Sequence, residues 1–146
     1  MQDMQDRRDW MGLLAKTPPA ALAALWEAAE APAFDWLRRP ETGTVMVRGR
    51  TGGTGTPFNL GEITVTRCAL RLPTGETGHA YVMGRDKAHA ERAALIDALM
   101  QTEAADSLRQ TVLDPLADAR AKARQTRAAK AAATKVEFFT MQRGED

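Results

Sequence analysis

Residues 45–62 read VMVRGRTGGTGTPFNLGE, a glycine-rich loop between two segments of extended character. The stretch holds five of the eleven glycines in the chain and two arginines, Arg48 and Arg50. Glycine costs conformational entropy wherever it is ordered, so this density indicates backbone shapes that other residues cannot take. Bare N–H groups beside fixed positive charge suit a bound anion or the close approach of a partner backbone.

The loop matches no standard phosphate-binding motif. A Walker A loop requires Lys-Ser/Thr after its last glycine, whereas Gly55 is followed by Thr56 and Pro57. A dinucleotide-binding fingerprint requires a third glycine where Phe58 stands. Residues 49–52 match the short GXXG of single-strand RNA-binding KH modules, but that loop joins two helices and this one leaves a strand.

We predict that this segment binds substrate through its arginines, loop residues and neighbouring polar side chains: Arg48, Arg50, Gly52, Gly53, Thr54, Gly55, Asn59 and Glu62. Arg48 and Arg50 lie two positions apart on a strand, so about 7 Å separates them on one face and both could hold one polyanion. Surface arginines at a sheet edge are an equally good interpretation. Glu62 could bind ribose hydroxyls or act as a base, but an ion pair with Arg48 or Arg50 is favoured.

Strands are predicted on both sides of the loop, at 44–50, 62–72 and 79–83. The apolar positions of the second strand change parity, from Ile63 and Val65 to Cys68 and Leu70, which predicts a bulge near Thr66–Arg67. Pro73–Glu76 has the composition of a turn.

Helical spacing dominates the two ends of the chain, with apolar stripes that include Trp10, Leu14, Leu22 and Trp26 before residue 40 and Ala93, Ile96 and Met100 after residue 85. A further turn of helix is expected at Phe34–Leu37, and a helix restart at Asp114–Pro115. Residues 134–141 have strand propensity. The predicted fold is α+β, one domain over residues 1–146, with a mainly antiparallel sheet flanked by N-terminal and C-terminal helices.

Composition limits the function classes. Aromatic residues make up only 5% of the 146 residues and alanine supplies much of the apolar content, so the core is modest and a permanent partner is plausible. A net charge of +1 argues against general nucleic-acid binding. Arg120, Arg124 and Arg127 nevertheless share a helix face, with no acid between Asp118 and Glu137, so this face is either solvated or docks a partner.

Cys68 is the only cysteine and cannot form an internal disulfide, which fits a reducing compartment. The charged N-terminus and the lack of a long apolar run predict neither a secretory signal nor a membrane span, so we expect a cytoplasmic protein. Two histidines and one cysteine are too few to predict a metal site. Cys68, among apolar neighbours, is more typical of a buried small hydrophobe than of a nucleophile.

Together these segments resemble the PhnG family, the small subunit of the bacterial carbon–phosphorus lyase core complex. The resemblance runs through RDWM at 8–11, LRRPETG at 37–43 and GRD at 84–86, and ends with VEFFTMQRGE at 136–145. It is strongest through VMVRGR at 45–50, GGTG at 52–55, PFNLGE at 57–62 and TVTRC at 64–68.

The resemblance implies a role in the use of organophosphonates as a phosphorus source. The expected partners are PhnI, PhnH and PhnJ, in a hetero-octamer with two copies of each subunit. With PhnI, PhnH and PhnL, the family supports displacement of adenine from ATP by a phosphonate, which gives a ribose 1-phosphonate 5-triphosphate. The later radical cleavage belongs to PhnJ and its iron–sulfur cluster, which one cysteine could not hold.

The resemblance assigns no catalytic residue to this subunit, so we expect a non-autonomous enzyme subunit that binds no cofactor alone, with ATP as a substrate of the complex. Two roles remain open for the segment from Arg48 to Glu62: substrate binding, or a purely structural contact with a partner backbone. RNA binding through residues 49–52 and the basic helix is disfavoured by the net charge of +1.

Overall fold

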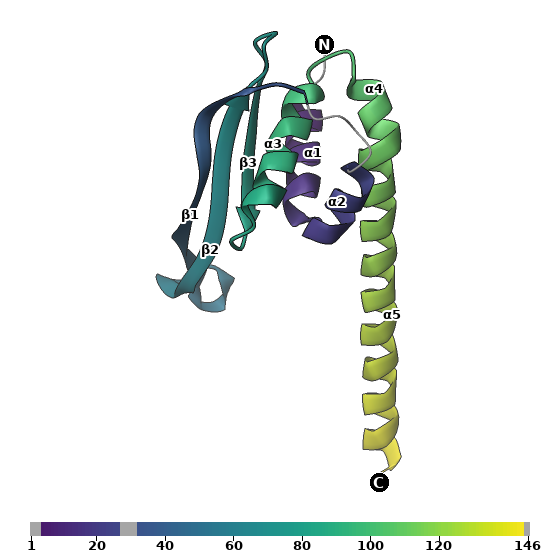
Figure 1. Cartoon of the computed structure of the whole chain (residues 1–146). Coiled ribbons are helices and arrows are strands. Elements are labelled where there is room, and N and C mark those ends of the chain that lie inside the picture. The colour runs from purple at the N-terminus through teal and green to yellow at the C-terminus, as the bar shows by residue number, and fades with distance from the viewer. Residues whose placement is uncertain (1–3, 27–31, 145–146) are drawn as a thin grey trace.

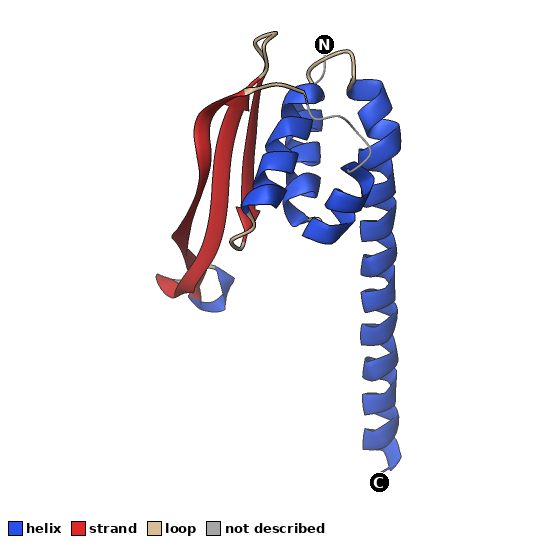
Figure 2. Cartoon of the chain, in the orientation of Figure 1, coloured by secondary structure: helices blue, strands red, loops and turns tan. Residues whose placement is uncertain are grey.

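The computed structural model describes residues 4–26 and 32–144 of the chain. Figure 2 shows a sheet on one side of the molecule and helices on the other. The elements in chain order are α1 (Met4–Lys16), α2 (Pro19–Trp26), β1 (Asp35–Arg50), a short 3-10 turn (Thr51–Gly53), β2 (Pro57–Arg71), β3 (Thr77–Met83), α3 (Lys87–Leu99), α4 (Ala105–Leu108), a π-helical segment (Arg109–Leu113) and α5 (Asp114–Gly144). Figure 1 labels the α-helices and strands.

The sheet is antiparallel with the order β1-β2-β3, so the predicted α+β class is confirmed. The helical turn expected at Phe34–Leu37 is wrong, because β1 already begins at Asp35. Trp36 pairs with Leu70 in the sheet, and its ring meets that of Phe34 edge-on at 4.8 Å. Cross-strand packing therefore outweighs the local helical spacing.

One face of the sheet is covered by helices. α3 packs on β2 and β3, and α1 packs on α3 and β3. β3 and α3 approach so closely that a Cβ on Gly78 would clash with the carbonyl oxygen of Ala94. The predicted apolar stripes supply much of the core between these layers: Trp10, Leu14, Leu22, Trp26, Ala93, Ile96 and Met100 are all buried.

The predicted bulge at Thr66–Arg67 is wrong. β2 and β3 pair without interruption from Val65 to Arg71. Thr66 is a buried polar residue on the helix-facing side, where its hydroxyl donates to the carbonyl of Gly84 at 2.7 Å. Val65 faces the opposite side and is also buried. β2 therefore has apolar residues on both faces, and this made the apolar positions change from odd to even numbers without a bulge.

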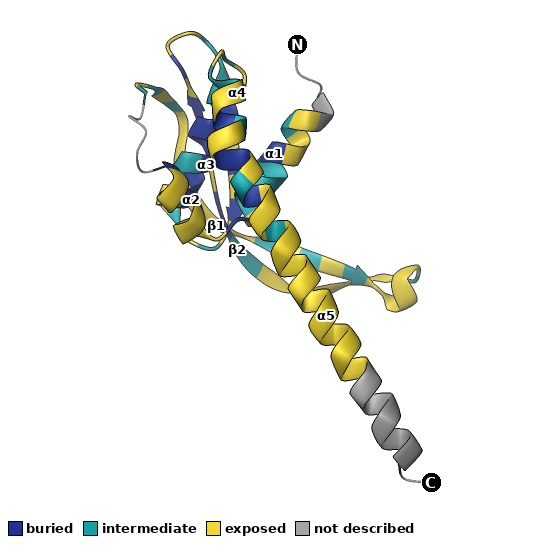
Figure 3. Cartoon of the chain, turned by 90° about the vertical axis from the view of Figure 1, so that its right-hand side faces the viewer, coloured by how far each residue is buried: buried dark blue, intermediate teal, exposed yellow. Residues whose placement is uncertain are grey.

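The strand expected at residues 134–141 is also wrong, because α5 continues as helix to Gly144. Its restart at Asp114, after the π-helical segment, agrees with the predicted break. Alanine is the best helix former, and the alanine-rich stretch before residue 134 favours continuation of the helix. Beyond Leu116 no residue up to Lys135 is buried, so this half of α5 projects from the body, as Figure 3 shows.

Candidate functional site

The predicted binding segment lies in a projecting hairpin. β3 pairs with β2 only from Val65 onward, so residues 44–64 form a two-stranded extension, here called the arm. No residue of the arm is buried, and Figure 1 shows its tip reaching below α3, on the opposite side of the molecule from α5. A two-stranded hairpin alone is at best marginally stable in water, so the arm is suited to a partner that covers it.

The glycines at the tip of the arm have a structural explanation. Gly52 and Gly53 adopt positive φ values of 62° and 84° within a single helical turn, a conformation that other residues rarely take. A Cβ on Gly55 would lie 2.6 Å from the carbonyl oxygen of Thr51, and the Gly55 amide donates to that same oxygen at 2.8 Å. The turn is therefore closed by its own hydrogen bonds, and Thr54 lies exposed at its tip.

A bulge in the arm brings the predicted polar residues onto one face. The register pairs Arg48 with Asn59 and Met46 with Glu62, and Leu60 is left without a partner between them. Because directly paired residues share a face, Arg48, Asn59 and Glu62 lie on the same side of the arm. Arg50 lies on that side too, two residues beyond Arg48.

Glu62 forms no ion pair among the described residues, so its predicted pairing with Arg48 or Arg50 is wrong. In the observed register Glu62 pairs with Met46 and Arg48 pairs with Asn59, so Glu62 stands directly opposite neither arginine. The carboxylate that does meet arginines on the sheet is Glu41, at 3.5 Å from Arg38 and 3.9 Å from Arg67.

The two arginines of the arm differ in their contacts. Arg50 Nη1 donates to the carbonyl of Gly55 at 3.4 Å, so its guanidinium folds back over the turn. Arg48 is exposed and makes no side-chain hydrogen bond or ion pair within residues 4–26 and 32–144. Arg48 is therefore the cation of the arm that is free to meet an anion.

The opposite face of the arm is apolar, a feature that the sequence interpretation missed. Phe58 and Leu60 are 46% and 62% exposed, and atoms of both lie within 3.3 Å of the point where a Cβ on Gly49 would stand. By the strand register this face also carries Val45, Val47 and Ile63. The alternation of Val45 and Val47 with Met46 and Arg48 was the signal for it.

A second polar cluster, also missed from sequence, lies in the core. Asp97 is fully buried, and its carboxylate accepts four hydrogen bonds. Oδ1 accepts from Trp10 Nε1 at 2.8 Å and Arg7 Nε at 3.2 Å, while Oδ2 accepts from Arg7 Nη2 at 3.0 Å and the His79 amide at 2.9 Å. The cluster joins α1, β3 and α3, so its role is to hold the body together.

Cys68 is a buried thiol rather than a nucleophile, as predicted. Burial, reinforced by the nearby charge of Glu91, raises its pKa from 9.0 to about 12. Its Sγ donates to the carbonyl of Ala90 at 3.3 Å. The thiolate, the reactive form, is therefore scarce at neutral pH.

His89 is also a buried packing residue. Its Nε2 lies 2.8 Å from the carbonyl oxygen of Leu14, and since a carbonyl can only accept, Nε2 carries the proton. Within the described residues, no three His, Cys, Asp or Glu side chains gather as a metal site would require. None of the described helices has both the length and the hydropathy needed to cross a bilayer.

Comparison with known proteins places this arrangement in a family. The sequence matches the family described as "Phosphonate metabolism protein PhnG" over residues 5–144. The chain belongs to the PhnG family. A curated relative from Rhizobium meliloti (strain 1021), the "Alpha-D-ribose 1-methylphosphonate 5-triphosphate synthase subunit PhnG", is 49% identical over an alignment of 146 positions that covers 96% of this chain and 90% of the relative. The PhnG match spans the arm and α5, so both projections lie within the matched region.

Proposed function

We propose that this chain is a non-autonomous subunit of alpha-D-ribose 1-methylphosphonate 5-triphosphate synthase, in organophosphonate catabolism. The observation that carries the proposal is the 49% identity, over 96% of the chain, to a relative with that name. The exposed arm supports a subunit that is completed by others, because it offers an apolar face and an arginine face that the described residues of the chain do not cover.

In the proposed reaction, a phosphonate oxygen attacks C1′ of ATP. The bond from C1′ to adenine N9 breaks, the bond from C1′ to the phosphonate oxygen forms, and adenine leaves with the electron pair and takes up a proton. Both reactants are anions, so their approach requires compensating positive charge. Fixed cations that bind the triphosphate are what this chain can supply, whereas the group that protonates adenine is assigned to a partner.

The proposed partners are PhnI, PhnH and PhnJ in a hetero-octamer, with PhnL assisting the transfer step. The chain would bind no cofactor by itself, and ATP would be a substrate of the whole complex. In this assembly Arg48, Arg50 and Asn59 would face the triphosphate, since they share the polar side of the arm. Glu62 lies on the same side and forms no ion pair within the described residues. Its carboxylate would accept a hydrogen bond from a ribose hydroxyl.

A structural role for the arm is the second candidate, and the apolar face favours it. Phe58 and Leu60 expose large apolar side chains that would be buried against a partner chain without any contact with substrate. Both roles can coexist, because the apolar and polar residues lie on opposite sides of the arm. The two roles differ in one expectation: only substrate binding requires Arg48 and Arg50 for turnover by the assembled synthase.

The subunit assignment is tested by turnover of ATP with methylphosphonate. The purified chain alone should release no adenine, whereas the synthase co-expressed with it should. Robust adenine release by the isolated chain would refute a non-autonomous role.

The arginine assignment is tested by Arg48→Ala/Arg50→Ala in the assembled synthase. Neither residue is buried, so the variant should assemble, while adenine release should fall by about tenfold or more. Arg71→Ala is the matched control, because Arg71 is an exposed arginine on β2 in the body of the sheet. Normal turnover by the assembled arm variant would remove the substrate role and leave the structural one.

A further inference from the structure

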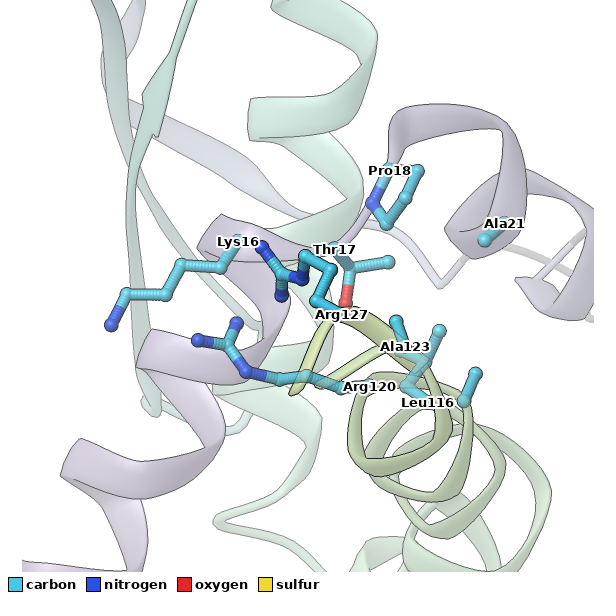
Figure 4. A pocket seen from close by; sticks show the side chains of 9 residues that line it. Lys16, Thr17, Pro18, Ala21, Leu116, Arg120, Ala123 and Arg127 are labelled. Carbon is cyan, nitrogen blue, oxygen red and sulfur yellow. The ribbon is translucent and has the colours of Figure 1, made fainter. Parts of the chain in front are cut away.

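A groove separates α5 from the junction of α1 and α2. Its volume is about 440 Å³, and Figure 4 shows side chains from all three helices and the junction around it. The lining residues are Lys16, Thr17, Pro18, Ala21, Leu116, Ala119, Arg120, Ala123 and Arg127.

The charged lining of the groove is entirely cationic. Lys16, Arg120 and Arg127 approach it from α1 and α5, and none of the carboxylates in the described part of the chain lines it. None of the three makes a side-chain hydrogen bond or ion pair with the part of the chain that the structure describes. Like charges gathered in this way repel one another, so a bound anion would reduce the electrostatic repulsion among the three cations.

The other lining residues make the groove two-sided. In Figure 4 the cationic side chains lie on one side, and Pro18, Ala21 and Leu116 lie on the other. A simple anion would use only the first side. An acidic segment with an apolar side chain would use both, since the apolar group fills the groove while carboxylates meet the cations.

The cationic character continues along the projecting half of α5. Between residues 119 and 135 the helix carries six cations and no acid: Arg120, Lys122, Arg124, Arg127, Lys130 and Lys135. Arg120 and Arg124 are four residues apart, a spacing at which like charges destabilise a helix. These 17 residues span about 25 Å of helix with no buried residue, which is long enough to lie along a protein segment.

We infer that the groove and the basic stretch 119–135 dock an acidic, amphipathic segment of another subunit of the synthase. The inference rests on the proposed membership of the synthase, but it does not require the arm to contact substrate. Charge complementarity supplies the orientation, and the apolar side of the groove supplies the buried contact. A nucleic acid would match the cations alone, and the net charge of +1 disfavours it.

The test is Arg127→Glu in the full chain, co-expressed with the other synthase subunits, with recovery of the assembled complex as the readout. Arg8→Glu is the matched control, because it makes the same charge change at an exposed residue of α1 that lies outside both the groove and the basic stretch. Recovery should fall by about tenfold or more for Arg127→Glu and remain within about twofold for Arg8→Glu. Raising the salt concentration should weaken assembly of the wild-type chain, since the contact is electrostatic.

A second variant, Arg120→Gln/Arg127→Gln, removes the charges without adding new ones, and circular dichroism of each purified chain verifies folding. Equal recovery of all variants and wild type overturns the inference, while failure of the wild-type chain to join the synthase would overturn the proposed function instead. Binding of single-stranded RNA or inorganic triphosphate that Arg127→Glu abolishes, with assembly unchanged, assigns the groove to a free anion and also overturns the inference.

Discussion

β1 and β2 build two regions of this molecule with opposite surroundings. In the body, β2 lies between β1 and β3 and is covered by α3. In the arm, neither a third strand nor a helix from residues 4–26 and 32–144 covers the same two strands, and no arm residue is buried. The contrast separates the part of the hairpin that maintains the fold from the part that the fold leaves available for another molecule.

The largest expected effect is in the body. Asp97→Ala removes the acceptor for Trp10, Arg7 and the His79 amide, and should lower the free energy of unfolding by about 3 kcal/mol or more. Chemical denaturation measures this value. Asp118→Ala, an exposed carboxylate on α5, is the control and should change it by less than about 0.5 kcal/mol. Equal losses for the two variants would show that the buried cluster does not stabilise the body.

A pair of leucines on β2 compares the two regions directly. Leu70 is completely buried, so Leu70→Ala should cost about 2–5 kcal/mol of folding free energy. Leu60 is 62% exposed on the arm, so Leu60→Ala should cost less than about 0.5 kcal/mol and should instead weaken assembly with the synthase by about tenfold. Normal assembly of Leu60→Ala would contradict an interface on the apolar face of the arm.

A smaller effect concerns thiol reactivity. The pKa of Cys68 is raised to about 12 from 9.0, so at pH 8 its thiolate should be about a thousandfold scarcer than that of an unfolded thiol. Labelling of Cys68 by a thiol reagent should therefore require unfolding of the chain. A thiol placed on the arm by Thr54→Cys should react at once, because Thr54 is exposed. Equally rapid labelling of Cys68 and the arm thiol would contradict the burial of Cys68.

The same pKa shift predicts a pH dependence. Because the thiol of the unfolded chain ionises first, the free energy of unfolding should fall as the pH rises from 9.0 toward 12.

The fold class was predictable because the apolar spacing of the helices and the glycine loop are local signals. Two of the errors, at Phe34–Leu37 and at Thr66–Arg67, came from tertiary contacts. Phe34–Leu37 has helical spacing, but Trp36 packs across the sheet opposite Leu70. The apparent bulge at Thr66–Arg67 arose because a buried threonine occupies an inner position that the pattern assigns to an apolar residue.

The candidate site was predictable only in part. The shared face of Arg48 and Arg50 follows from strand alternation, but the pairing of Arg48 with Asn59 depends on the bulge at Leu60. Asp97 could not be assigned from sequence, because its partners lie 18 to 90 residues away along the chain. The groove on α5 likewise depends on how α2 and α5 pack, which periodicity does not reveal.

The most direct test of the central claim, that the arm is completed by a partner, is amide exchange measured on the chain alone and in the assembled synthase. Residues 48–59 should exchange rapidly in the isolated chain, because exposed hydrogen bonds with few packed neighbours open easily, and should slow markedly on assembly. Residues 63–72 should be protected in both states, since β2 there pairs on both sides over most of its length. Equal protection of residues 48–59 with and without partners would mean that the arm is a self-contained structural turn, and would contradict the account.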